Sequence, residues 1–100
     1  MILIADSGAS KTDWGCVSRN SDACIRFTSQ GYNPNYITGP QIVEDILKNK
    51  PADLDPESVK EIYFYGAGVT PLQYPFMEET LRKVFTKAEH VFIAMDTLAS

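Results

Sequence analysis

The chain has 100 residues and a net charge of −4, with 44% hydrophobic and 22% charged residues, which fits one small globular domain. The acidic balance and the lack of clustered Lys and Arg argue against nucleic acid or an anionic membrane surface as a partner. No apolar run is long enough for a membrane span, and the apolar start lacks the basic region of a signal peptide. We therefore expect a cytoplasmic protein in which Cys16 and Cys24 are reduced, small apolar residues.

The first 29 residues predict three short strands. Residues 1–6 are apolar up to the last position, and a cluster of turn-forming residues separates them from a second strand at 12–18. Residues 23–29 alternate between apolar and polar side chains, as a strand with one buried face does. Tight turns between the three segments predict an antiparallel meander.

Beyond the loop at 30–38, the pattern predicts helices alternating with strands. Gly39 and Pro40 open a helix that Pro51 ends. Three more elements are expected after it, namely a strand at 61–65, a helix at 75–87 and a strand at 90–95.

This order of elements predicts an α/β fold. Strands separated by helices run parallel to one another, and right-handed crossovers place them beside the first strand. We therefore predict a mixed five-stranded sheet of order 3-2-1-4-5 with two or more helices packed on it. The continuous apolar run at 91–95 predicts a last strand that is buried on both faces.

Three polar clusters follow predicted strands, where open α/β sheets bind ligands. The first is residues 6–12, with the sequence DSGASKT. Its small residues allow a phosphate close to the backbone N–H groups, and a carboxylate at Asp6 suits a bridging Mg²⁺. It is not a Walker loop, because a strand follows it where that motif requires a helix. The alternative is a tight hairpin turn whose polar side chains only satisfy the backbone.

The other two clusters surround Asn35 and Asp96. Residues 31–35 (GYNPN) offer two amide side chains for sugar hydroxyls, or they form an ordinary Asn-Pro turn. Asp96 ends an apolar strand, where a carboxylate can accept a proton from a substrate hydroxyl during phosphoryl transfer. Its alternative role is a helix N-cap. His90, at the other end of that strand, is more typical of an edge residue than of a catalyst.

Together, four segments resemble the BadF/BadG/BcrA/BcrD ATPase family, which includes N-acetylglucosamine kinases and has the actin-like ATPase (ribonuclease H-like) fold. Residues 6–13 resemble its first phosphate segment, and residues 31–35 its substrate loop. Residues 65–68 resemble its small-residue turn, and residues 96–99 the segment that carries its catalytic Asp. Ser7 and Ala9 depart from the pattern by replacing glycines, and Ser10 replaces Thr.

The resemblance implies ATP-dependent phosphorylation of a sugar, N-acetylglucosamine or a related hexosamine, with ATP and Mg²⁺ as cofactors. By this resemblance, Asp6 would hold Mg²⁺ through water, and the ATP phosphates would be faced by Gly8, Ser10, Lys11 and Thr12. Asn35 would bind sugar hydroxyls, and Ala67 and Gly68 would lie near the C2 substituent. Asp96 would be the general base.

Family members are much longer, so residues 1–100 are expected to be the N-terminal ATPase domain of a larger protein and to have little activity alone. A surface that normally faces the missing half would favour self-association, which leaves a homodimer open. Two other functions remain. An ATPase that activates a 2-hydroxyacyl-CoA dehydratase needs cysteines for an iron–sulfur cluster, and Cys16 and Cys24 are poorly placed for one. A non-enzymatic sugar-sensing regulator is the other alternative.

Overall fold

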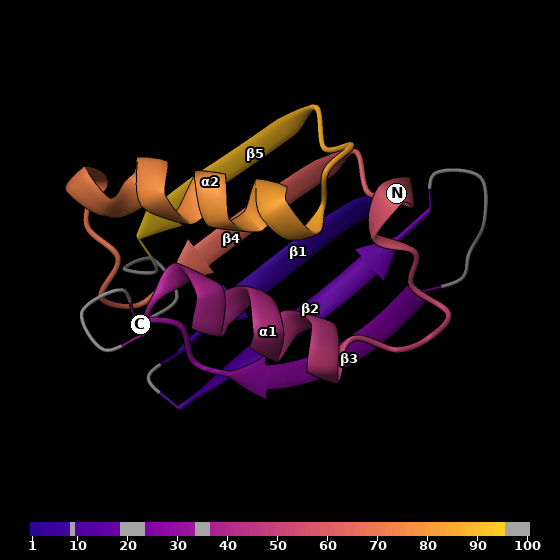
Figure 1. Ribbon diagram of the computed structural model, residues 1–100, viewed down its shortest axis with the longest axis horizontal. Coiled ribbons are helices and arrows are strands. Elements are labelled where there is room, and N and C mark those ends of the chain that lie inside the picture. Colours follow the sequence, from indigo (N-terminus) through magenta and orange to yellow (C-terminus); the bar gives the residue numbers. More distant parts are fainter. Residues whose placement is uncertain (9, 19–23, 34–36, 96–100) are drawn as a thin grey trace.

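The computed structural model describes residues 1–8, 10–18, 24–33 and 37–95. Within them, five strands form one sheet of order β3-β2-β1-β4-β5, and both described α-helices pack on the same face of it (Figure 1). The predicted α/β fold and strand order are therefore confirmed. The elements are β1 (Ile2–Ser7), β2 (Lys11–Val17), β3 (Cys24–Gln30), α1 (Gly39–Asn49), β4 (Glu61–Gly66), α2 (Tyr74–Val84) and β5 (His90–Met95).

Strand direction brings three strand ends to one edge of the sheet. β1 pairs antiparallel with β2 and parallel with β4, and β4 pairs parallel with β5. Ser7, at the end of β1, stands opposite Thr12 of β2 and Gly66 of β4. We call the edge where β1, β4 and β5 end the carboxyl edge, and it is where α/β sheets bind ligands.

Local signals set the helix ends. Thr38 caps α1 through a capping box with Gln41, in which the Thr38 amide donates to Gln41 Oε1 (2.9 Å). α2 ends at Val84 rather than at residue 87 as predicted. The next side chain, Phe85, is fully buried, so the backbone leaves the helix to place this ring in the core.

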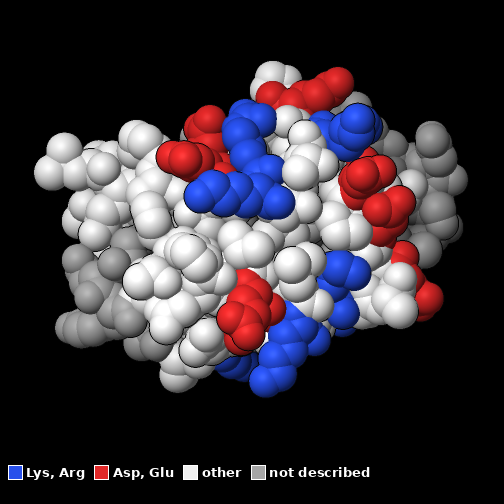
Figure 2. Space-filling view, in the orientation of Figure 1, with Lys and Arg blue, Asp and Glu red and all other residues white. Residues whose placement is uncertain are grey.

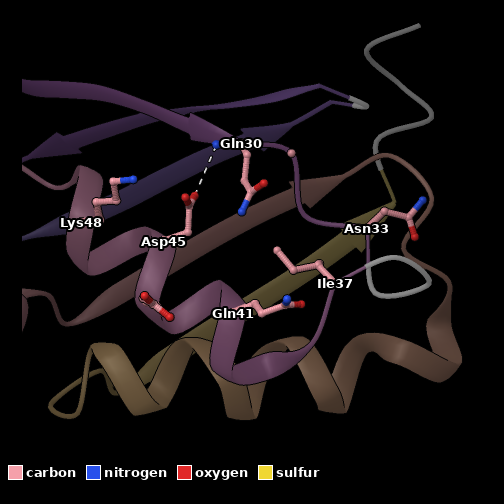
Figure 3. Close-up of a pocket in the computed structure, with 8 residues that line it drawn as sticks. Gln30, Asn33, Ile37, Gln41, Asp45 and Lys48 are labelled. Atoms are coloured by element: carbon pink, nitrogen blue, oxygen red, sulfur yellow. Dashed lines mark hydrogen bonds between the residues drawn. The ribbon is translucent and has the colours of Figure 1, made fainter.

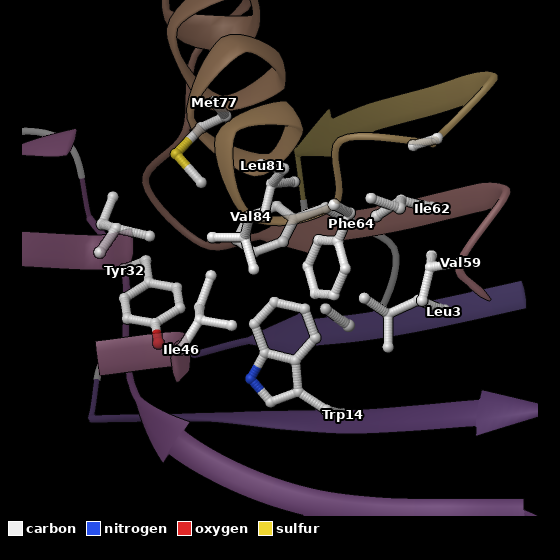
Figure 4. Close-up of a cluster of buried hydrophobic side chains, with 14 of the residues drawn as sticks. Leu3, Trp14, Tyr32, Ile46, Val59, Ile62, Phe64, Met77, Leu81 and Val84 are labelled. Carbon is white, nitrogen blue, oxygen red and sulfur yellow. The ribbon is translucent and has the colours of Figure 1, made fainter. Parts of the chain in front are cut away.

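The core lies between the two helices and the sheet (Figure 4). Leu3, Trp14 and Phe64 rise from the strands, and the Trp14 ring packs against both Phe64 and Tyr32 with centroids 6.3 Å apart. The helices contribute side chains that are fully buried: Ile42, Ile46, Met77 and Leu81. None of the helices in the described part of the chain is long and apolar enough to span a membrane.

The opposite face of the sheet differs from the expectation for β5. We call this the open face and define it by Ile4, Tyr63, Tyr65 and Phe92, which alternate with core residues along their strands. Phe92 is 52% exposed while its neighbour Ile93 is 7% exposed. The prediction that β5 is buried on both faces is therefore wrong, because β5 is an edge strand and the described helices pack only on the other face.

The two cysteines lie on different faces of the sheet, because side chains alternate between the two faces along a strand. Cys16 points into the core, whereas Cys24, which pairs with Val17, is exposed. Both are free thiols, as expected, but only Cys16 is a buried apolar residue.

Candidate functional site

Three of the segments selected from the sequence lie together at the carboxyl edge. They are the β1–β2 turn within residues 6–12, the start of the loop after β3 at residues 31–33, and the glycine turn after β4 within residues 65–68. The Ala67 amide donates to the Ser7 carbonyl (2.8 Å), and the Tyr32 amide donates to Ser7 Oγ (3.0 Å). Two predicted site residues, Asn35 and Asp96, lie outside the described residues.

The β1–β2 turn is closed by its own backbone. The Gly8 amide donates to the Lys11 carbonyl (2.8 Å), and a side chain added at Gly8 would come no closer than 3.5 Å to that oxygen. Ser10 and Lys11 are exposed, and Lys11 Nζ lies 3.8 Å from Asp13 Oδ1. A contact of this length between exposed groups is weak, so the ammonium can turn toward an anion.

Successive side chains of β1 diverge at this edge. Asp6 is exposed on the open face and stands opposite Asp13 in the β1–β2 register. Ser7 and Thr12 are buried on the helix-covered face. The Thr12 hydroxyl lies 2.8 Å from Ser7 Oγ and 2.9 Å from the Gln30 carbonyl. The side chain of Thr12, which the resemblance assigned to phosphate, is therefore engaged inside the protein.

The loop after β3 contacts the glycine turn through Asn33. Gly68 has a φ of 81°, in the left-handed region that favours glycine. A Cβ at Gly68 would lie 2.6 Å from Asn33 Nδ2, so the amide group packs directly over the glycine backbone. The segment predicted to bind sugar hydroxyls and the segment predicted near the C2 substituent are thus in contact.

A hollow of about 400 Å³ lies beside this loop, between the end of β3 and α1 (Figure 3). Its lining is mainly polar, with amide and carboxylate side chains from Gln30, Asn33, Gln41, Glu44 and Asp45. Asp45 supports the loop from below, because its Oδ2 accepts from Tyr32 Oη (2.7 Å) and from the Gln30 amide (3.3 Å). Burial raises the pKa of Tyr32 well above its usual range, so the phenol remains a donor to Asp45.

Charge is mixed on the visible surface. Figure 2 shows acidic and basic side chains interspersed over the helix-covered face, with no large patch of one sign. The expectation that nucleic acid is not a partner stays a prediction.

The predictions from sequence did not include Asp45, the packing of Asn33 on Gly68 or the connecting role of Ser7. Asp45 had a signal, since it lies on the same side of α1 as the buried Ile42 and Ile46, where a carboxylate needs a partner. The contacts of Asn33 and Ser7 join segments that are far apart along the chain, and no local pattern indicates them.

A mixed sheet of this order, with polar turns gathered at its carboxyl edge, is the architecture of an actin-like ATPase (ribonuclease H-like) domain. No family model and no curated protein matches the chain. Among solved structures, it is similar to a protein from Porphyromonas gingivalis named "Putative N-acetylglucosamine Kinase", with 32% sequence identity and a TM-score of 0.79.

That alignment covers 96% of this chain and 34% of the Porphyromonas gingivalis protein, so the chain spans about a third of its neighbour's length. The neighbour's name is that of the kinase type that the sequence motifs resemble. The predicted resemblance to N-acetylglucosamine kinase-like proteins is therefore confirmed.

Proposed function

We propose that the chain forms part of an ATP-dependent kinase that phosphorylates N-acetylglucosamine or a related hexosamine. The observation that carries this proposal is the 32% identity, along nearly the whole chain and in the same fold, with a protein whose name is that of such a kinase. The site supports it, since the β1–β2 turn, which resembles a phosphate segment and is called the phosphate-type turn below, meets the polar loop after β3 at one sheet edge.

The β1–β2 turn would hold the nucleotide. Gly8 leaves its backbone open to close approach, and the exposed Ser10 and Lys11 supply further donors to phosphate oxygens. Asp6 is exposed, and Mg²⁺ is commonly held by one or two carboxylates together with water and substrate phosphates. The residues present therefore fit MgATP, and the bound cation would neutralise charge on the phosphates.

The loop after β3 and the glycine turn would hold the sugar. Asn35 would bind its hydroxyls, and Ala67 and Gly68 would lie beside the C2 substituent. Asp96 would accept the proton of the attacking hydroxyl as its oxygen bonds to the γ-phosphorus and the bond to ADP breaks. The contact between Asn33 and Gly68 supports this proposal, because the two segments proposed to face the sugar lie side by side.

The proposal is tested on the full-length polypeptide that contains this sequence, by steady-state kinetics with N-acetylglucosamine and MgATP varied separately. Asp96→Asn should lower kcat by roughly 10² to 10⁴, the usual contribution of a general base, with a smaller change in KM for the sugar. Asp6→Asn should instead raise the KM for MgATP. Absence of ATP-dependent phosphorylation of N-acetylglucosamine and of related hexosamines by the unmodified protein would refute the function, and a normal kcat for Asp96→Asn would refute the base.

The isolated chain of residues 1–100 should have little activity, because phosphoryl transfer depends on a closed, positioned cleft. Robust phosphorylation by the isolated chain would contradict this. A cluster-dependent ATPase is not favoured by the described cysteines, since Cys16 and Cys24 lie on opposite faces of the sheet.

A further inference from the structure

Ser7 is the residue on which the three segments of the candidate site converge. Its carbonyl oxygen accepts from the Ala67 amide of the glycine turn, at 2.8 Å. Its hydroxyl contacts Tyr32 in the loop after β3 and Thr12 at the base of the phosphate-type turn. The side chain is 1% exposed, so water cannot readily replace these contacts.

The hydrogen atoms along these contacts can be assigned. The Thr12 hydroxyl is 2.9 Å from the Gln30 carbonyl, and a carbonyl cannot donate, so the Thr12 hydrogen points to Gln30. The short contact of 2.8 Å between Thr12 Oγ1 and Ser7 Oγ then requires Ser7 to be the donor. The lone pairs of Ser7 accept the Tyr32 amide hydrogen. The result is a directed series of bonds from Tyr32 through Ser7 and Thr12 to Gln30.

This series fixes the start of the predicted sugar loop. Gln30 and Tyr32 flank Gly31, and both are held through Ser7 and Thr12. Asn33 follows directly and packs over Gly68. The β1–β2 turn, in contrast, also has its own closing bond between the Gly8 amide and the Lys11 carbonyl, so it depends less on the Ser7 hydroxyl than the loop does.

We propose that Ser7 is a positioning residue whose hydroxyl sets the place of the sugar loop relative to the phosphate turn. The inference rests on the proposed function, because it assigns Ser7 to the sugar side of the same site. It predicts a split between the two substrates: loss of the hydroxyl should weaken the use of sugar while leaving the use of MgATP nearly unchanged.

Ser7→Ala in the full-length polypeptide tests this. The KM for N-acetylglucosamine should rise roughly 5- to 100-fold, the range expected when a buried N–H loses its acceptor, and the KM for MgATP should stay within about threefold. Ser7→Cys, with a weakly accepting thiol, should raise the sugar KM by a smaller factor, and it decides the question if Ser7→Ala does not fold.

Thr80→Val is the matched control. Thr80 is also a buried hydroxyl, and it donates to the Phe76 carbonyl within α2 (2.8 Å) rather than to one of the three segments. This variant should leave both KM values unchanged. An equal rise in sugar KM for Thr80→Val would show that general loosening explains the effect, which would overturn the proposal.

Amide hydrogen exchange separates this inference from the proposed function, because it needs no substrate. In Ser7→Ala the Tyr32 amide should exchange at least about tenfold faster, as expected for a buried bond that is lost. Unchanged exchange at Tyr32, or faster exchange with an unchanged sugar KM, would overturn the positioning role. An unmodified protein that lacks kinase activity would instead refute the function itself.

Discussion

The two faces of the sheet are built from alternate residues of the same strands, yet they lie in different environments. On the helix-covered face Leu3 and Phe64 are fully buried, while on the open face Ile4 is 45% and Phe92 52% exposed. Apolar side chains are therefore abundant on both faces, but only one face contributes a close-packed core. Hydrophobic content alone did not distinguish the two, since what decides burial is where the helices pack.

The same alternation divides the candidate site. Asp6 and Ser7 are adjacent in sequence, and the strand directs the first to solvent and the second into the core. A carboxylate that meets a hydrated cation needs exposure, whereas a hydroxyl that positions a loop needs partners shielded from water. The alternation of side chains along β1 therefore gives each of the two proposed roles the environment that it requires.

The largest expected effect is on the helix-covered face. Phe64→Ala removes a fully buried ring that packs against Trp14. It should lower the free energy of unfolding by about 3–5 kcal/mol, as truncation of a core aromatic residue does. Urea denaturation of the full-length protein measures this, and a loss below about 1 kcal/mol would mean that the core is not packed as described.

The reactivity of the two cysteines tests the difference between the buried and the open face of the sheet. Burial raises the pKa of the Cys16 thiol, which lowers its thiolate fraction, and the side chain is also shielded from solvent. Cys24 is exposed. Iodoacetamide should modify Cys24 roughly 10² times faster than Cys16, because Cys16 reacts only after local opening. Peptide mass spectrometry over a time course provides the rates, and equal rates would place both thiols in one environment.

A smaller effect is expected at Tyr32. Its folded-state pKa is raised above the ordinary value near 10 mainly by burial, so the unfolded chain loses this proton at a lower pH than the folded chain. The contribution of the protonated Tyr32 to the free energy of unfolding is therefore fully present below about pH 10 and is lost as the pH rises beyond it. Tyr32→Phe should remove that part of the alkaline decline.

At neutral pH, Tyr32→Phe should cost only about 1–3 kcal/mol, because the 2.7 Å bond to Asp45 is lost while the ring remains. Unfolding curves at pH 7 and at several values above 10 make the comparison. An unchanged alkaline slope in the variant would show that Tyr32 ionises normally.

The smallest effect is expected on the open face. Phe92→Ala truncates a half-exposed ring whose neighbours are Tyr63 and Tyr65, with centroids about 6 Å away. The free energy of unfolding should change by less than about 1 kcal/mol in the isolated chain, as for other surface substitutions. A cost equal to that of Phe64→Ala would show that the open face is covered in solution.

Much of the fold could be predicted from sequence because its signals are local. Alternation located β3, continuous apolar runs located β4 and β5, and Pro40 marked the start of α1. The end of α2 could not be predicted, since it depends on Phe85 entering a core that forms only in the folded chain. The exposure of Phe92 was missed for the same reason.

For the site, the sequence selected the right segments but not how they are joined. The predicted strand order puts β4 beside β1, and at their ends the Ala67 amide does bond to the Ser7 carbonyl. The packing of Asn33 on Gly68 depends on a contact between residues 35 positions apart, which no local pattern encodes. The roles of Asn35 and Asp96 stay predictions, because both residues lie outside the described part of the chain.

The mixed sheet also has a consequence for how the chain folds. β1 pairs with β2 across a short turn, but its other edge pairs with β4, which comes much later in the chain. In that parallel pair Ile2 stands opposite Glu61. Non-local pairing of this kind is slow because the connecting chain must first close on itself. At ~5–20 residues per second, a ribosome takes about 3–12 s to make those intervening residues. During that interval the β1–β2–β3 meander should form first, while the edge of β1 that later pairs with β4 is still unpaired. Pulse-labelled hydrogen exchange should then show protection in the meander before β4 and β5, and simultaneous protection of all five strands would exclude this order.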